Sequence, residues 1–451
     1  MIAQSNPKSW PRPPLAWYTV GVLLIAFLFS SIDRVILGLL VVPIKQDLGL
    51  SDAAMGTLLG IAFAAAFTIT GLLVGVLADR YSRRVIVSVA VTIWSLATAA
   101  CGLANNFVQL LIGRLTVAAG ESALSPAAFS MISDSFPPKQ LGRALGVYMS
   151  GAFFGAGISF LVGGAVLGLV GSSQVAELPL LGEVRIWQLA FFLVGLPGLL
   201  VGLLALTLTE PARRGVARQR PSGTEVFRFV LARKRLFGCH MAGFGMLAVV
   251  IVVVLSWAPT MFVRAHGLTS SQAGLQLGVI LLIFSPAGIF TGGWLVDTWQ
   301  RAGRSDAPLL VGIVAALTTL PFAIVANTTT DGRLALLLHG PFVFFASLAV
   351  ACGPTAIQLA VPNEFRAQLS ATYLMALNIL TAAFGATGVG FATDYVFRDE
   401  QAIGYSIALV IGACAPTAAL LLWAGRTPFR EARAREAEIL QAEASLATAS
   451  A

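Results

Sequence analysis

Four ionisable residues lie inside apolar stretches of this chain and could do chemistry there. Asp33 and Arg34 interrupt one stretch in SSIDRVILG, and Arg114 and Glu121 interrupt another in GRLTVAAGES. A charged side chain near the centre of a bilayer costs about 2.5–3.5 kcal/mol on the insertion scale. We therefore expect the four to pair with one another, to face a water-filled cavity, or both. Such a cluster predicts a path along which something crosses a membrane.

The spacing of these residues suggests how they could work together. Arg114 and Glu121 are seven residues apart, about 20° short of two helical turns, so they share one helix face. A substrate anion that engages Arg34 or Arg114 would release an acid to bind a proton, because burial favours the neutral acid and a nearby arginine favours the charged one. We predict that Asp33 and Glu121 carry protons and that Arg34 and Arg114 bind the anion or control the pKa of the acids. A purely structural ion-pair network is the alternative.

Composition places this cluster in a membrane protein. The chain has 451 residues, of which 57% are hydrophobic and 11% charged, whereas soluble proteins carry about 25% charged residues. Twelve apolar runs are each long enough to cross a bilayer as a helix, and none alternates as barrel strands do. They span residues 15–42, 52–78, 84–103, 107–133, 140–170, 187–208, 236–263, 271–297, 307–327, 333–360, 366–395 and 402–425. The sequence predicts an all-α membrane protein with twelve transmembrane helices.

The distribution of basic residues predicts the topology. With a cytoplasmic N-terminus, 22 of the 29 Lys and Arg residues fall in cytoplasmic segments, which is the positive-inside pattern. We expect the protein to lie in a bacterial inner membrane with both termini on the cytoplasmic side. Topology also accounts for the net charge of +8, so no nucleic-acid partner is needed. The expected domains are an N-terminal segment 1–14, a six-helix bundle 15–208, a cytoplasmic linker 209–235, a second bundle 236–425 and a cytoplasmic tail 426–451.

The two predicted bundles carry an internal repeat. At an offset of 218 residues, LGLSDAAMGTLLG (48–60) aligns with HGLTSSQAGLQLG (266–278), with five identities in thirteen positions. The same offset superposes Gly75, Asp79 and Arg83 on Gly293, Asp297 and Arg301. Transporters built from parallel repeats hold substrate between the halves and rock them to alternate access.

The loop after the second run, GVLADRYSRR (75–84), resembles the cytoplasmic loop motif of the major facilitator superfamily, with Ser82 where glycine is usual. A glycine allows close helix contact, and an aspartate at a helix end can accept amide hydrogens from an opposing helix. We expect a cytoplasmic gate in this region; simple topogenic charge is the alternative for the arginines. The gate residues are Gly75, Asp79, Arg80, Arg83, Asp134, Asp297 and Arg301.

Other polar residues inside the runs could line a cavity, although helix–helix hydrogen bonding explains each of them equally well. They are Tyr148, Trp257, Gln358, Tyr373 and Asn378. The four cysteines show no CxxC spacing, and no catalytic or metal motif is present. We therefore expect neither an enzyme nor a metal site, and no cofactor beyond the proton gradient that drives transport.

SSIDRVILG together with GR…GES resembles the Spinster branch of the major facilitator superfamily. The resemblance implies proton-coupled transport of lysophospholipids, sphingosine or sphingosine-1-phosphate, with Asp33 and Glu121 as proton-coupling residues and Arg34 regulating them. Charges concentrated in the first half suit an amphiphile whose acyl tail contacts the apolar second half. The alternative is a proton-coupled carrier of small organic anions or drug-like molecules. We expect a monomer whose partners are substrate, protons and the lipid bilayer.

Overall fold

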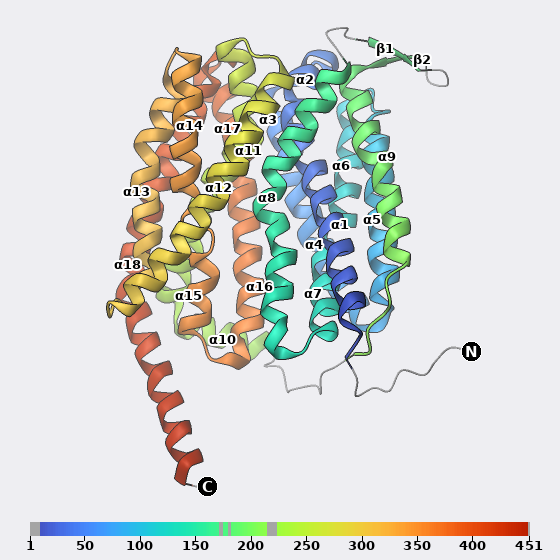
Figure 1. The fold of residues 1–451 in the computed structure, drawn as a ribbon. Helices are drawn as coiled ribbons and strands as arrows, with labels where there is room; N and C mark the ends of the chain where they lie inside the picture. Colours follow the sequence, from blue (N-terminus) through green and yellow to red (C-terminus); the bar gives the residue numbers. More distant parts are fainter. Residues whose placement is uncertain (1–9, 171–174, 179–181, 214–222, 450–451) are drawn as a thin grey trace, which may run out of the picture. The chain divides into compact units, whose positions relative to one another are not determined.

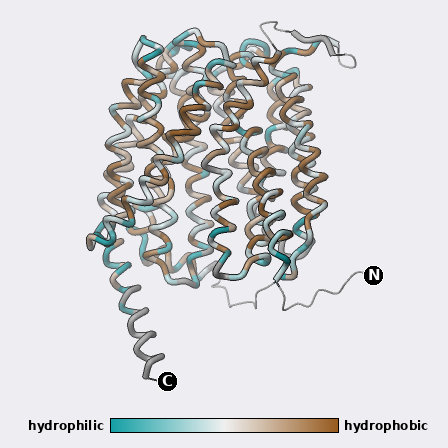
Figure 2. The backbone as a smooth tube through the Cα atoms, in the orientation of Figure 1, coloured by the Kyte–Doolittle hydropathy of each residue, from teal (hydrophilic) through white to brown (hydrophobic). Residues whose placement is uncertain are grey.

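The computed structural model describes residues 10–170, 175–178, 182–213 and 223–449, with side chains omitted at some positions within these ranges, among them 75–80. Twelve helical segments in these ranges are long and apolar enough to span a membrane, as predicted. Figure 1 shows the path of the chain, and Figure 2 shows long apolar stretches with hydrophilic residues gathered toward helix ends. Leu200, Leu337 and Leu420 are each more than two-thirds exposed, as expected of side chains that face lipid.

Residue contacts group the chain into two compact units. Unit 1 comprises residues 1–216, 255–282 and 390–401, and unit 2 comprises 217–254, 283–389 and 402–451. Unit 1 therefore takes in segments from the second half of the sequence as well as the whole first half. The boundaries predicted from the sequence follow the apolar runs instead, and they stay a prediction.

The first half of the chain forms nine helices and one hairpin within the described residues. These are α1 (Pro13–Leu39), α2 (Val41–Leu48), α3 (Asp52–Leu59), α4 (Ile61–Arg80), α5 (Arg83–Cys101), α6 (Phe107–Glu121), α7 (Leu124–Ser135), α8 (Pro138–Val170), β1 (Val175–Leu178), β2 (Gly182–Arg185) and α9 (Ile186–Leu206). The strands pair antiparallel, with Val175 opposite Arg185. The sequence did not predict this hairpin.

The second half contains helices and connecting turns, and no strand, within its described residues. Its elements are α10 (Gly223–Ala232), α11 (Lys234–His266), α12 (Ser270–Arg301), α13 (Ala307–Thr328), α14 (Gly332–Ser347), α15 (Cys352–Ala360), α16 (Asn363–Leu380), the π-helical turn η1 (Thr381–Ala386), α17 (Thr387–Phe391), the π-helical turn η2 (Ala392–Phe397), the 3₁₀ turn η3 (Glu400–Ala402) and α18 (Ile403–Ala449). The predicted tail is not separate from the last span, because α18 runs through both.

Local sequence explains several helix ends. Ser51 caps α3 by accepting a hydrogen bond from the amide of Ala54, and Asn106 caps α6 through the amide of Gln109. Asp331 caps α14 through two amides. Gly49 ends α2 in a left-handed conformation, with φ of 62°, which glycine adopts without strain.

The fourth and tenth spans are both interrupted. The fourth breaks between α6 and α7, directly after Glu121, and the tenth breaks between α14 and α15. The same position in each half is therefore broken, in agreement with the internal repeat. Backbone groups freed at such a break are tolerated in a membrane only where protein or water satisfies them.

Each unit has its own apolar core. In unit 1, Trp94 from α5 and Val117 from α6 lie in one buried cluster with residues of α1, α7 and α9. In unit 2, Phe244 from α11, Val311 from α13 and Leu422 from α18 belong to a second cluster. The core of unit 1 includes residues of α1 and α6, the two helices that carry the four ionisable residues.

Candidate functional site

The four predicted ionisable residues come together in unit 1. α1 supplies Asp33 and Arg34, and α6 supplies Arg114 and Glu121. Asp33, Arg114 and Glu121 are each 2% exposed. The side chain of Arg34 is 43% exposed, so it is the accessible member of the cluster.

Arg34 and Glu121 form a direct ion pair. Nε of Arg34 lies 2.6 Å from Oε2 of Glu121. Ser30, one turn before Arg34 on α1, donates its hydroxyl to the same oxygen at 2.9 Å. Oε1 of Glu121 is buried and accepts no hydrogen bond within the described part of the chain. One carboxylate oxygen is thus strongly bound and the other is left unsatisfied.

Asp33 and Arg114 interact through the main chain. Nη1 of Arg114 donates to the carbonyl oxygen of Asp33 at 3.1 Å. Among the residues that the structure describes, Oδ1 of Asp33 and Nε of Arg114 have no hydrogen-bond partner. A buried polar atom without a partner costs about 1–3 kcal/mol, and more when it is charged. The quartet is balanced in formal charge but is not a set of two closed ion pairs.

Two phenylalanines of α4 face the arginines, and our sequence reasoning missed them. Cζ of Arg34 lies 5.3 Å from the ring centre of Phe63 and 5.0 Å from that of Phe67, and Cζ of Arg114 lies 4.9 Å from Phe63. The two rings stack on each other with centroids 6.1 Å apart. Their spacing in IAFAAAF, four residues apart on one helix face, was the available signal. They give the arginine site a partly aromatic wall.

The residues predicted to line a cavity fall into different surroundings. Tyr148 is buried and stacks on Phe27, while Tyr373 is buried beside the ring of His240. Trp257 is buried, Asn378 is half-buried and Gln358 is exposed. Tyr148 and Tyr373 therefore belong to the apolar cores of their own units, and a cavity-lining role for these residues stays a prediction.

The predicted gate region contains a buried arginine with many partners. Arg83, at the start of α5, pairs with Asp134 at the end of α7. Its Nε donates to Glu210 at 2.8 Å, and its other nitrogens donate to Ser130 and to the carbonyl oxygen of Pro211. All of these residues belong to unit 1. In the described structure Arg83 and Asp134 therefore brace one unit internally, and a gating role stays a prediction.

Glu210 was not predicted, although it follows the sixth apolar run directly in LTEPARR. Burial opposes its ionisation, but hydrogen bonds from the Arg84 amide and from the side chains of Arg83 and Ser82 outweigh burial, so the pKa of Glu210 lies below its usual value. The side chains of Asp79 and Arg80, and the surroundings of Gly75, lie outside the described residues.

In unit 2 a buried acid is surrounded by arginines, whereas in unit 1 the buried Arg83 is surrounded by acids. Asp306, the residue before α13, is fully buried and accepts hydrogen bonds or ion pairs from Arg426 at 2.6 Å and Arg430 at 2.7 Å. Burial raises the pKa of Asp306, but the two arginines outweigh it and hold the pKa below its usual value. The predicted gate residues Asp297 and Arg301 lie exposed at the end of α12, where Nε of Arg301 donates to the carbonyl oxygen of Asp297.

A further ionic network in unit 1 was not predicted. Arg264 donates both terminal nitrogens to the two carboxylate oxygens of Asp52, each at 2.7 Å, and Lys45 lies 3.0 Å from the same carboxylate. Lys45 also lies 2.8 Å from Glu400. Asp52 is fully buried. Two segments far apart in sequence, around α2–α3 and at the end of α11, are therefore held together by a paired arginine and carboxylate, the strongest kind of such contact.

The described residues contain no group of His, Cys, Asp and Glu side chains arranged to hold a metal ion. The arrangement presents a partly exposed cation, Arg34, paired with a buried carboxylate, Glu121.

Comparisons with known proteins agree with this reading of the fold. An MFS-type efflux pump of Mycolicibacterium smegmatis is 27% identical over 93% of this chain and 94% of its own length. A probable L-galactonate transporter of Escherichia coli is 25% identical over 90% of this chain and 88% of its own. The crystal structure of a bacterial homologue of the human lysosomal transporter Spinster, in an inward-facing and unoccupied conformation, matches with a TM-score of 0.80. That match covers 94% of this chain and 99% of the other at 24% identity, so it speaks for the fold.

The model of the Major Facilitator Superfamily matches residues 23–389, which is most of the chain and includes all four ionisable residues of the site. Twelve membrane-spanning helices, the repeat and this match lead to one conclusion: the chain belongs to the Major Facilitator Superfamily and is a multi-pass membrane transporter.

Proposed function

We propose that this transporter is proton-coupled and carries an organic anion, with Arg34 binding the anionic group and Glu121 taking up the proton. The observation that carries the proposal is the contrast within one ion pair: the side chain of Arg34 is 43% exposed, while the side chain of its partner Glu121 is 0% exposed. A ligand can reach the arginine without first reaching the acid.

The coupling follows from competition for Arg34. A carboxylate or phosphate group of the substrate accepts hydrogen bonds from the guanidinium as Glu121 does. When Arg34 turns to the substrate, Glu121 keeps the hydroxyl of Ser30 but loses its cation. A buried carboxylate without a cation binds a proton more readily. Substrate binding and proton binding therefore favour each other.

Asp33 is the second proposed proton carrier. Its Oδ1 is buried and has no hydrogen-bond donor among the described residues, so this oxygen is available to take up a proton. Arg114 contacts its main chain and holds the region between α1 and α6 together. We assign Arg114 a supporting role, because its side chain is buried and Arg34 is the arginine that a ligand can reach.

Two substrate classes fit this site. A small organic acid such as a sugar acid is supported by the name of the L-galactonate transporter to which this chain is similar. A lysophospholipid or a sphingosine-1-phosphate-like amphiphile is supported by Phe63 and Phe67 beside Arg34, and by the likeness to the Spinster homologue. We favour the small organic acid, since a relative that matches nearly the whole chain bears the name of a sugar-acid transporter.

Uptake into proteoliposomes tests both parts of the proposal. We expect an acid-outside pH gradient to drive uptake of labelled galactonate, and a protonophore to abolish the accumulation. The same assay with labelled lysophosphatidic acid shows whether the vesicles accumulate the lysophospholipid or the small organic acid. Accumulation that is unchanged by collapsing the gradient would remove the proton from the mechanism.

A further inference from the structure

A basic pocket lies in unit 2, far along the chain from the four-residue site. It has a volume of about 400 Å³ and lies between the α10–α11 junction and the part of α18 that follows the last apolar run. Its charged lining residues are Arg233, Lys234, Arg235, Arg435 and Glu431. The pocket thus carries four cations against one carboxylate. A cavity of this size falls within the range that holds small ligands or parts of larger ones.

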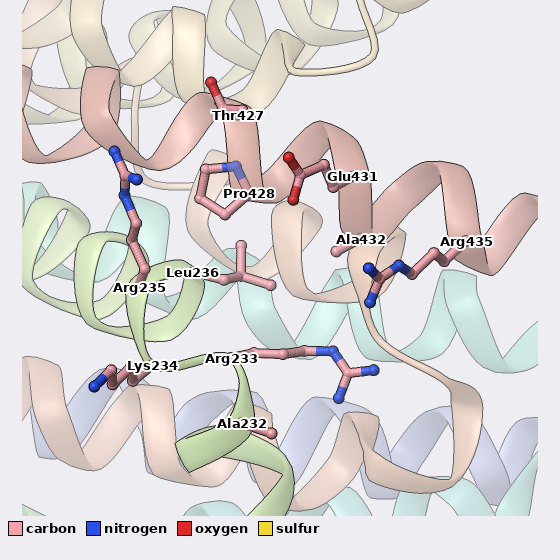
Figure 3. A pocket seen from close by; sticks show the side chains of 10 residues that line it. All are labelled: Ala232, Arg233, Lys234, Arg235, Leu236, Thr427, Pro428, Glu431, Ala432 and Arg435. Atoms are coloured by element: carbon pink, nitrogen blue, oxygen red, sulfur yellow. The ribbon is translucent and has the colours of Figure 1, made fainter.

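The floor of the pocket is apolar. Leu236, Pro428 and Ala432 lie between the basic side chains, as Figure 3 shows. Arg233 lies with its Cζ 4.0 Å from the ring centre of Phe229, and that ring stacks on Phe365. At least one cation is therefore held in place by packing, rather than extending freely into water.

The arginines of α18 divide into two groups. Arg426 and Arg430 pair with Asp306, and Arg433 donates to the carbonyl oxygen of Ser305. Arg435 lies on the pocket instead. Within the described residues, no carboxylate lies within salt-bridge distance of Arg435, Lys234 or Arg235. Arg426 and Arg430 are therefore neutralised by an acid, whereas, in the described part of the chain, Arg435 is not.

The surroundings indicate where an anion would come from. Trp423 and Leu420 precede the pocket on α18 and are 65% and 68% exposed, as side chains that face lipid are. A tryptophan at this position is typical of the boundary between the acyl chains and the headgroups. Basic clusters directly beside a membrane-spanning helix bind anionic lipid headgroups.

We propose that this pocket binds the phosphate-bearing headgroup of an anionic phospholipid, with its acyl chains along the exposed apolar face of α18. Lys234, Arg235 and Arg435 supply the charge, and Arg233 completes the ring of donors. The same chemistry could hold a free phosphate ester, so the test separates the two sources. The site is independent of the transport reaction, and its test does not use transport.

The test measures the melting temperature of the purified full-length protein in detergent, with phosphatidylglycerol, phosphatidylcholine or glycerol phosphate titrated in. We expect phosphatidylglycerol to raise the melting temperature saturably and the other two to have no effect. In Arg235→Gln/Arg435→Gln the apparent affinity for phosphatidylglycerol falls by about thirtyfold. The matched control Arg228→Gln/Arg304→Gln removes two exposed arginines that do not line the pocket, and it should respond as the parent does.

Removing the carboxylate gives an opposite and independent readout. Glu431→Gln deletes the one acid of the pocket lining and should tighten binding of phosphatidylglycerol. An unchanged response of Arg235→Gln/Arg435→Gln, or weaker binding in Glu431→Gln, would overturn the proposal. Equal stabilisation by glycerol phosphate would overturn the lipid as ligand and assign the pocket to soluble phosphate esters. Failure of phosphatidylglycerol to stabilise the parent protein would overturn the site altogether.

Discussion

Nε of Arg34 lies 2.6 Å from Oε2 of Glu121, and this contact joins an accessible base to a buried acid across α1 and α6. Glu121 is the last residue of α6, and the helix breaks immediately after it. When Arg34 exchanges Glu121 for another partner, the residue that loses its ion pair is therefore the one at which the fourth span is interrupted.

Replacing Arg34 by Ala should weaken substrate binding. A hydrogen bond to a charged group contributes about 1.5–3 kcal/mol, so the loss corresponds to roughly tenfold to a hundredfold in affinity. Arg34→Lys keeps the positive charge but loses the planar guanidinium, so its substrate affinity should lie between those of the parent protein and Arg34→Ala. Equilibrium binding of labelled substrate to the purified protein measures the effect. Arg333→Ala, at an exposed arginine outside the site, is the control; equal loss in both variants would contradict a specific role for Arg34.

Replacing Glu121 by Gln should separate substrate exchange from proton coupling. Glutamine keeps the size and one acceptor oxygen for the hydroxyl of Ser30 but cannot exchange a proton at neutral pH. We expect substrate counterflow between loaded vesicles to persist while accumulation driven by a pH gradient disappears. Asp33→Asn should reduce gradient-driven accumulation as well. A variant Glu121→Gln that still concentrates substrate with the gradient would assign the coupling to another acid.

The contact between Asp52 and Arg264 should keep the start of α3 and the end of α11 together. Removing one partner leaves a buried charge without its counter-charge, which costs about 3–5 kcal/mol. We expect Asp52→Asn and Arg264→Gln each to slow transport and to make Ala53, engineered as Cys, more accessible to a membrane-impermeant thiol reagent. Ala53 follows Asp52 directly on α3 and is half-buried, so the accessibility of a cysteine there reports on this contact.

A double-variant cycle separates the pair from its parts. In Asp52→Asn/Arg264→Gln the two losses should be far from additive, because both single variants break the same contact. Additive losses would show that the two residues act independently. Exposure of the thiol in the parent protein to the same extent as in the variants would contradict closure by this contact.

Acid should destabilise the protein by protonating two paired carboxylates, Glu210 beside Arg83 and Asp306 beside Arg426 and Arg430. The pKa of Asp306 and that of Glu210 lie below their usual values of 3.8 and 4.5. A carboxylate with a lowered pKa in the folded protein contributes stability above the unfolded pKa and loses it as the pH falls through the folded value. The melting temperature should therefore fall when the pH is lowered from 5 to 3, in roughly the range that these pKa values set.

Asp306→Asn and Glu210→Gln are the variants for this prediction. Each should have a lower melting temperature at neutral pH and a smaller decline on acidification than the parent protein has. An undiminished decline in the double variant would place the acid sensitivity elsewhere in the chain.

Much of the fold follows from the sequence because a membrane restricts the choices. Hydrophobic length fixes the number of spans, and in lipid each span must satisfy its own backbone, so helices are required. The repeat and the loop motif indicate the superfamily. We also predicted that the four charges would pair or face a cavity, since isolated charges in apolar helices need partners, but the sequence did not indicate which arginine meets which acid.

Partners whose side chains carry no unusual signal could not be predicted. The spacing of Phe63 and Phe67 places both on one face of a helix, but only the structure shows that this face lies against the arginines. Glu210 and Asp52 lie at the ends of runs, where acids are common. Which basic residue each acid meets depends on how helices pack, and hydropathy does not encode helix packing.

The ion pairs of Arg83 and of Asp306 have a consequence for how the chain assembles. At the start of the third span the first half places a cation, Arg83, against an acid that follows its sixth span, while the second half places an acid, Asp306, against arginines of its twelfth. If the sixth span packed against α13 instead of α5, Glu210 would lie beside Asp306. If the twelfth span packed against α5 instead of α13, Arg426 and Arg430 would lie beside Arg83. Duplicated sequences risk such cross-pairing during insertion, and like-charge repulsion at both wrong junctions penalises it. A duplicated fold thus distinguishes its own halves by the sign of one buried charge.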